Sequence, residues 1–189
     1  MWKVSLMVTC LGDAFFPNVG VATVRLLRRL GVAVDFPAQQ TCCGQPFFNS
    51  GYRIDARDLA RHTIRAFDNG RLIVTPSGSC AAMVKLEYAE LFAEDLVWHG
   101  RAEDLARRTH ELSDFLVNVL GIDDVGARGE GKATYHMACH LRGLGLQKEP
   151  ERLLRNVRGL DYVPLERSDE ATEREIFCRV GDRGGRLVG

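Results

Sequence analysis

The chain has 189 residues, of which 46% are apolar and 26% are charged. Lysine and arginine number 25 together, as do aspartate and glutamate, so the formal net charge is zero and binding of nucleic acid or membrane surfaces through bulk positive charge is excluded. No apolar stretch is long enough to span a bilayer, and the N-terminal apolar run is too short for the core of a signal peptide. We therefore expect a cytoplasmic protein with no membrane span and no nucleic-acid partner.

The pattern of apolar residues predicts strands and helices that alternate along the first part of the chain. In chain order, the expected strands are residues 3–9, 32–36 and 72–75. The expected helices are residues 18–30, 50–69, 80–93 and 102–120. Alternation of this kind predicts an α/β fold with a Rossmann-like parallel sheet. In such a sheet, the loops that leave the carboxyl ends of the strands meet at one edge, where ligands usually bind.

Four cysteines lie in the loops that follow these strands. Cys10 follows the first strand, the adjacent pair Cys42 and Cys43 follows the second, and Cys80 follows the third. Because the loops meet at one edge, we expect the four thiols to gather there. Neighbouring cysteines are strained disulfide partners, whereas their thiolates can bind different irons of one iron–sulfur cluster. Gly44 would leave room for inorganic sulfide. The pattern favours such a cluster, with a single zinc ion or buried unligated cysteines as alternatives.

The sequence then restarts this pattern after the linker-like stretch "GIDDVGARGEG". A strand is expected at residues 133–136 before Cys139, followed by a helix at 150–158 and a strand at 160–163. At the spacing that separates Cys10 from Cys42, a second Cys-Cys-Gly would begin at Ala171, but it does not. We therefore expect three parts, in which Cys178 is incidental: a first repeat at 1–125, an incomplete second repeat at 126–170 and a divergent, disordered tail at 171–189.

Three polar residues beside Cys139 are weaker candidates for a substrate or metal site. His136 and His140 could ligate iron or zinc, and Arg142 could pair with the carboxylate of a substrate. The alternatives are histidines that pack or donate hydrogen bonds, and a solvated arginine. No Ser-His-Asp set or pair of catalytic carboxylates stands out, so no catalytic residue is assigned.

Four stretches together resemble the cysteine-rich CCG family of iron–sulfur proteins. They are "CLGDAFFPNVG", "FPAQQTCCGQPFFNSG", "TPSGSCAAMV" and "YHMACHLRGLG". The family is similar in using two Rossmann-like repeats, and it includes subunits of lactate-utilization, glycolate oxidase and heterodisulfide reductase systems. The chain is most similar to the lactate-utilization members, and the resemblance covers residues 1 to about 170.

This resemblance implies a ligand set and a function. Cys10, Cys42, Cys43 and Cys80 would ligate an iron–sulfur cluster, expected to be of the 4Fe–4S type, and Cys139 would begin a second ligand set. The chain would be an electron-transferring oxidoreductase subunit in the oxidation of L-lactate to pyruvate. Its partners would be other iron–sulfur or oxidoreductase subunits and a small hydroxy-acid substrate. The alternatives are a glycolate oxidase or heterodisulfide reductase subunit, a truncated non-catalytic remnant and a zinc-binding module.

Overall fold

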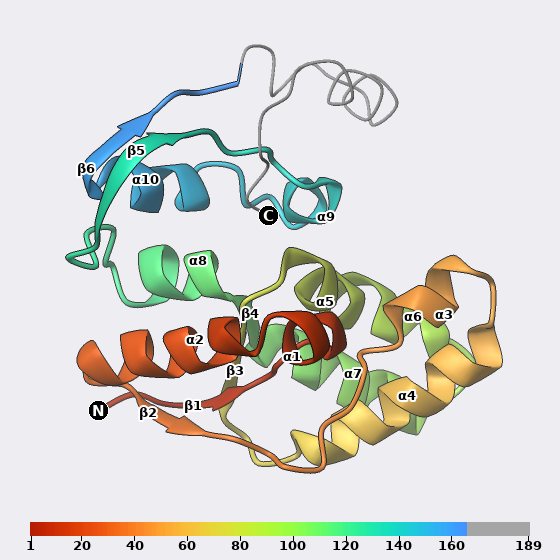
Figure 1. Ribbon diagram of the computed structural model, residues 1–189. Coiled ribbons are helices and arrows are strands. Elements are labelled where there is room, and N and C mark those ends of the chain that lie inside the picture. Colours follow the sequence, from red (N-terminus) through yellow and green to blue (C-terminus); the bar gives the residue numbers. More distant parts are fainter. Residues whose placement is uncertain (166–189) are drawn as a thin grey trace.

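A computed structural model describes residues 1–165 of the chain. The remaining residues, 166–189, lie outside the described part, and with them the expected tail at 171–189 and Cys178. The described residues form two stacked units, each with its own sheet (Figure 1). The lower unit contains a four-stranded sheet, and the smaller upper unit contains a two-stranded sheet and two helices.

The four strands of the lower sheet all run parallel, in the order β2-β1-β3-β4. Their bounds are β1 Lys3–Leu6, β2 Ala33–Asp35, β3 Leu72–Thr75 and β4 Thr109–Glu111. Val4 of the central strand β1 pairs with Val34 of β2 on one side and with Leu72 of β3 on the other. Helices follow each strand and flank the sheet, so the predicted α/β fold with a Rossmann-like parallel sheet is confirmed.

Helices connect the strands of the lower unit and continue beyond β4. Their bounds are α1 Cys10–Phe15, α2 Pro17–Arg29, α3 Gln45–Asn49, α4 Arg53–Ala66, α5 Gly78–Ala82, α6 Tyr88–Leu91, α7 Leu96–Arg108 and α8 Leu112–Asp114. Two π-helical turns, η1 Met83–Glu87 and η2 Phe115–Val119, extend α5 and α8. The α2 helix begins with Pro17, whose fixed φ angle and missing N–H suit the first helical position. The helix expected to start at Ser50 starts instead at Arg53.

The two faces of the sheet bury two separate cores, because successive strand residues point to opposite faces. Ile73 contributes to a core with α4, α6 and α7, which includes Ile64, Tyr88 and Leu105. The next residue, Val74, contributes to a second core with α2 and η2, which includes Leu27 and Phe115. Each helix layer therefore hides one face of the sheet from water, and the carboxyl edge of the strands is left for the loops.

The expectation of one helix over residues 102–120 is wrong. The α7 helix ends at Arg108, and the chain then forms β4, whose Thr109 pairs with Ile73 of β3. The Thr109 hydroxyl donates a hydrogen bond to the carbonyl of Leu105 at 2.8 Å, and Lys85 Nζ donates to the carbonyl of Thr109 at 2.9 Å. Pairing with the sheet edge thus overrides a helical pattern of apolar residues that is continuous in the sequence.

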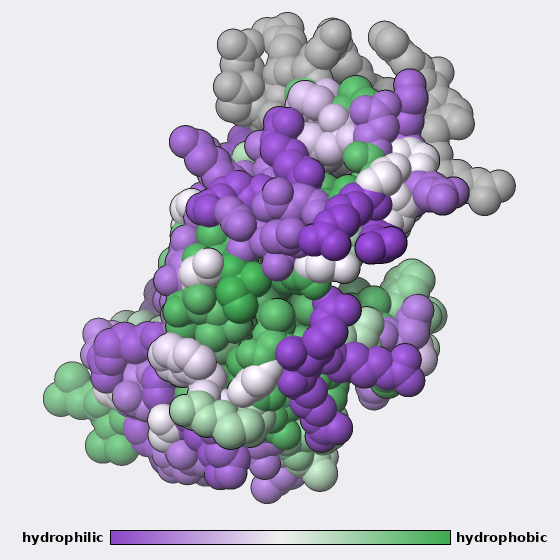
Figure 2. All heavy atoms as spheres, turned by 90° about the vertical axis from the view of Figure 1, so that its left-hand side faces the viewer, coloured by the Kyte–Doolittle hydropathy of each residue, from purple (hydrophilic) through white to green (hydrophobic). Residues whose placement is uncertain are grey.

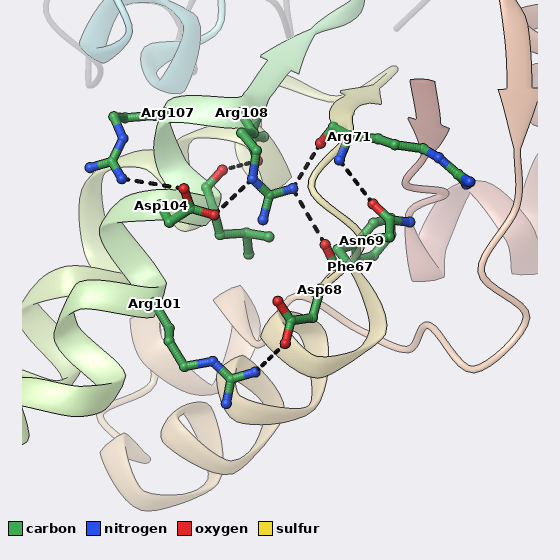
Figure 3. A network of polar contacts seen from close by, with 10 residues as sticks. Phe67, Asp68, Asn69, Arg71, Arg101, Asp104, Arg107 and Arg108 are labelled. Atoms are coloured by element: carbon green, nitrogen blue, oxygen red, sulfur yellow. Dashed lines mark hydrogen bonds and ion pairs between the residues drawn. The ribbon is translucent and has the colours of Figure 1, made fainter. Parts of the chain in front are cut away.

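An arginine network fastens α7 to the connection between α4 and β3 (Figure 3). The Arg108 guanidinium, whose side chain is 14% exposed, donates to Asp104 Oδ2 at 2.8 Å and to the carbonyl of Arg71 at 2.7 Å. Arg101 pairs with Asp68 at 2.7 Å on the same side of the helix. The hydrogen bond from Arg108 holds the pKa of the Asp104 carboxyl below its ordinary value.

The upper unit repeats the order of elements that opens the lower one. Its elements are β5 Arg128–Ala133, α9 Cys139–Gly143, α10 Glu149–Arg155 and β6 Arg158–Tyr162, with β5 and β6 parallel. As in β1-α1-α2-β2, the first helix begins at a cysteine and the second leads into the parallel strand. The expected strand at 133–136 is displaced to β5, which overlaps the end of the stretch that resembled a linker. The polar, glycine-rich sequence of β5 carries no strand pattern, and its pairing with β6 produces the strand.

The two units are joined through side chains of both. Viewed from the end at which the N-terminus lies, apolar side chains gather across the middle of the molecule, and hydrophilic side chains cover much of the upper unit (Figure 2). Leu153 of α10 packs against the second core of the lower unit, and Leu141 of α9 lies over Gly78 of α5, where a Cβ atom would approach its Cγ to 2.6 Å. Within residues 1–165, no helix has the length and apolar character needed to cross a membrane.

Candidate metal centre

The four cysteines of the lower unit meet at the carboxyl edge of the sheet. Cys10 Sγ lies 3.5 Å from Cys42 Sγ, and Cys43 Sγ lies 3.3 Å from Cys80 Sγ. Cys42 and Cys43 are adjacent in the chain, so the loop that carries them joins the two contacting pairs. The predicted gathering of four thiols from three loops is therefore confirmed, whereas their role as metal ligands stays a prediction.

Cys10 is held at the start of a short helix. Thr9 caps α1 with its side-chain oxygen, which accepts a hydrogen bond from the Gly12 N–H at 2.8 Å. A Cβ atom at Gly12 would approach this oxygen to 2.6 Å, so the glycine makes the cap possible. The cap fixes Cys10 as the first residue of α1, with its side chain exposed beside the loop that carries Cys42.

Gln40 ties the loop after β1 to the loop after β2. Its Oε1 accepts a hydrogen bond from the Val8 N–H at 2.8 Å, and its Nε2 donates to the carbonyl of Leu6 at 3.1 Å. The same nitrogen donates to the carbonyl of Pro37 at 3.1 Å. The Gln40 amide thus pairs with backbone groups at the end of β1, as a neighbouring strand would, and it keeps the loops of Cys10 and Cys42 together. Nothing in the sequence distinguishes it from the neighbouring Gln39.

Gly44 bends the chain immediately after the vicinal cysteines. It has a φ of +89°, in the left-handed region that suits glycine, and its N–H donates to Cys42 Sγ at 3.4 Å. A Cβ atom here would lie 3.3 Å from the carbonyl oxygen of Ala56 and from Leu59 Cβ. The expectation that Gly44 leaves room for inorganic sulfide is wrong, because α4 fills that space. The glycine allows the turn to pack on α4 instead.

Cys80 is presented by the helix that follows β3. The Ser77 side chain caps α5 by accepting a hydrogen bond from the Cys80 N–H at 3.4 Å. Gln45 Nε2 donates to the carbonyl of Ser79 at 3.1 Å, which joins this helix to the residue after Gly44. Cys43 and Cys80 are 5% and 7% exposed, so these two of the four thiols are shielded from water. The thiols of Cys10 and Cys42 are more exposed.

Hydrogen bonds between the thiols divide them into two kinds. The interaction with the neighbouring Cys43 thiol lowers the pKa of Cys42 to about 5, and the Gly44 N–H contributes in the same direction. Cys43 Sγ donates its hydrogen bond to Cys80 Sγ, and this lowers the pKa of Cys80. Conversely, its contacts with Cys42 and Cys80, together with burial, raise the pKa of Cys43. Burial and then the contact with Cys42 raise the pKa of Cys10. Without a bound metal, protons therefore stay on Cys10 and Cys43, and Cys42 favours the thiolate at neutral pH.

The donor set fits a group that is ligated by thiolates. Sulfur is the usual protein ligand of iron–sulfur clusters and a common ligand of zinc. The four sulfurs come from three loops and include a lowered-pKa thiol in each contacting pair. In the described part of the chain, no three or more His, Cys, Asp or Glu side chains are arranged to hold one metal ion, so the fit rests on the donor chemistry of the four thiols and not on a preformed cage for a single ion.

The upper unit brings one of its candidate residues next to this group. His140 Nε2 lies 2.9 Å from Gln45 Nε2, so the imidazole nitrogen accepts the hydrogen bond if the amide is the donor. Cys139, the first residue of α9, is exposed. His136 is exposed and Arg142 is half-buried on the same segment. Their roles as metal or substrate ligands stay predictions.

Comparison with known proteins relates the same residues to a family. Residues 4–85, which include the four gathered cysteines, match the CCG family, described as a cysteine-rich domain. A protein of Geobacillus sp. (strain WCH70) named lactate utilization protein A is 53% identical over 164 residues, which are 86% of this chain and 68% of that protein. A protein of the same name from Geobacillus thermodenitrificans is 56% identical over 164 residues, again 86% of this chain and 68% of that protein. That of Bacillus licheniformis is 53% identical over 169 residues, 89% of this chain and 71% of that protein.

Proposed function

The chain belongs to the lactate utilization protein A family, and on this premise we propose that it serves lactate utilization by holding an iron–sulfur cluster on Cys10, Cys42, Cys43 and Cys80. The observation that carries the proposal is the meeting of two contacting thiol pairs, Cys10 with Cys42 and Cys43 with Cys80, at the carboxyl edge of the sheet. An iron–sulfur cluster bound there supplies one-electron transfer.

In this proposal, the protein's own residues set what must change when a metal binds. Ligation requires thiolates, and the protons that Cys10 and Cys43 retain must leave when a metal binds. The Gly44 N–H, which donates to Cys42 Sγ, is placed to stabilise negative charge on that sulfur. The buried thiols of Cys43 and Cys80 form the side shielded from water. Cys10 is exposed, so the open side at Cys10 and Cys42 is where an electron donor or acceptor could approach.

The names of the relatives support a more specific role. We propose an oxidoreductase subunit that transfers electrons during the oxidation of L-lactate to pyruvate, with a cluster of the 4Fe–4S type and other iron–sulfur subunits as partners. In this proposal, residues 1–125 form one complete repeat and residues 126–170 begin a second, with Cys139 as its first ligand. The shared order of elements in β1-α1-α2-β2 and β5-α9-α10-β6 supports the repeat.

Iron and acid-labile sulfide, measured per chain after anaerobic purification, test the proposed cluster. The parent chain is expected to contain both, and the double variant Cys42→Ser, Cys43→Ser should lose both while keeping its far-ultraviolet circular dichroism. Cys139→Ser is the matched control, because it removes a thiol outside the group and should retain the iron of the first site. A folded, colourless parent that contains zinc or no metal would contradict the proposal.

A further inference from the structure

The side chain of Tyr88 reaches the vicinal cysteines from inside the first core. Tyr88 is fully buried, and its hydroxyl donates a hydrogen bond to the carbonyl oxygen of Cys43 at 2.8 Å. The ring packs among the apolar residues that α4, α6 and α7 contribute to this core. A buried tyrosine ring has little freedom, so the hydroxyl is a fixed point to which the cysteine loop is attached.

A π-helical turn makes this reach possible. The α5, η1 and α6 segments form one continuous helical stretch that carries both Cys80 and Tyr88, eight positions apart. In a regular α-helix, eight residues rotate about 80° beyond two full turns, which would separate the two side chains. The wide turn, in which the Tyr88 N–H bonds to the carbonyl of Met83, takes up one extra residue and brings them within about 20° of one face. The stretch therefore contacts Cys43 twice, by thiol and by hydroxyl.

The contact to the Cys43 carbonyl extends to Cys42 through one rigid peptide unit. The Cys43 carbonyl and the Gly44 N–H belong to the same planar peptide and point in opposite directions. Tyr88 holds the carbonyl at 2.8 Å, and the N–H points at Cys42 Sγ, 3.4 Å away. Fixing one end of this plane fixes the other, and the left-handed φ of Gly44 lets the chain leave in that orientation.

We propose that Tyr88 is a positioning residue for the candidate metal centre. Its hydroxyl orients the Cys43–Gly44 peptide so that the Gly44 N–H is aimed at the Cys42 sulfur and both vicinal thiols keep their places. The inference rests on the proposed function for its link to a cluster, whereas the orientation of the peptide is a property of the metal-free chain as well.

The variant Tyr88→Phe tests the role by removing one oxygen atom. In metal-free, reduced protein, the Gly44 amide should exchange its hydrogen about fivefold faster, and iodoacetamide should alkylate Cys42 at a changed rate, because the peptide has lost its anchor. In reconstituted protein, the visible and electron paramagnetic resonance spectra of any cluster should change. Tyr52→Phe is the matched control, since Tyr52 lies exposed at the start of α4 and should leave all three readouts unchanged.

If the Tyr88 hydroxyl only stabilised the fold, Tyr88→Phe would change the readouts no more than another destabilising change in the same core. Phe92→Leu destabilises the same core without removing a hydrogen bond to Cys43, so it shows what lost stability alone does to the readouts. The substitution of Tyr88 by 4-aminophenylalanine keeps a donor at the same place and should restore the parent values, even if Tyr88→Phe folds poorly. Unchanged Gly44 exchange and spectra in a folded Tyr88→Phe protein, or changes equal to those of Phe92→Leu, would overturn the inference. A parent without iron would defeat the proposed function but leave the exchange test valid.

Discussion

Replacement of Gln40 by leucine removes the side-chain amide that joins the loop of Cys10 to the loop of Cys42. Three hydrogen bonds are lost, from the Val8 N–H at 2.8 Å and to the carbonyls of Leu6 and Pro37 at 3.1 Å each. At about 1 kcal/mol for each neutral hydrogen bond, the sum is about 3 kcal/mol. The site is half-buried, so water can replace part of this loss, and we expect the free energy of unfolding to fall by about 2 kcal/mol.

Urea unfolding of the reduced, metal-free chain, followed by tryptophan fluorescence, measures this change. The control is Gln39→Leu, which makes the same substitution one residue earlier and should alter the free energy by less than about 0.5 kcal/mol. The loss of the link should also let the Cys10 and Cys42 thiols separate, which lowers the iron retained after reconstitution. A decrease below about 0.5 kcal/mol in Gln40→Leu, with unchanged iron, would refute the role assigned to this side chain.

Three further predictions follow from the same site and from the arginine network. Gly44→Ala should lower the free energy of unfolding by at least about 1 to 2 kcal/mol in urea titrations, because alanine is strained at a φ of +89°. An unchanged urea midpoint would show that the left-handed turn at Gly44 is not needed for stability. In the metal-free chain, the alkylation rate of Cys42 should rise with a midpoint near pH 5, because the interaction with the Cys43 thiol lowers the pKa of Cys42 to about 5. Cys43→Ala should move the midpoint upward, and a midpoint near 9 in the parent would disprove the role of Cys43. Arg108 lowers the pKa of Asp104, so this carboxyl binds fewer protons in the folded state than in the unfolded state. Its contribution to stability is present above the ordinary carboxyl pKa and is lost as the pH falls through the lowered value. Asp104→Asn should therefore flatten the dependence of the unfolding free energy on acid pH, and equal slopes in parent and variant would contradict this.

The gathering of the thiols could be predicted from the sequence because the topology of the sheet already places their loops at one edge. Cys10, the vicinal pair and Cys80 each follow a strand, and a parallel sheet brings such loops to one edge whatever the details of packing. The β3 strand lies at the expected residues 72–75, a short β-rich run between Arg71 and the turn that starts at Pro76. The ligand role of these thiols and the division into repeats stay predictions.

Elements stabilised by distant partners could not be predicted in this way. The β4 strand lies inside a stretch with helical periodicity and exists because Thr109 pairs with Ile73 of β3. The β5 strand, "RGEGKA", has no large apolar and no β-branched residue and is defined by its pairing with β6. Local sequence carries no sign of either partner.

The residues that hold the site in place were missed because their contacts span long stretches of chain. Gln40 bonds to Val8 and Leu6, and Tyr88 bonds to Cys43, which precedes it by 45 positions. A glutamine in a loop and a tyrosine in a helix are ordinary in composition. Tyr88 could have been found by noting that it stands eight positions after Cys80, but only if the π-helical turn between them had been known.

Native mass spectrometry of the anaerobically purified chain tests the central claim most directly, because it weighs whatever the four thiols hold on the folded protein. The account predicts an added mass equal to four irons and four sulfides in the parent chain and in Cys139→Ser. It predicts the bare chain in the variant Cys42→Ser, Cys43→Ser. A parent that shows the bare mass, or the mass of one zinc ion, would contradict the claim that this group of thiols holds an iron–sulfur cluster.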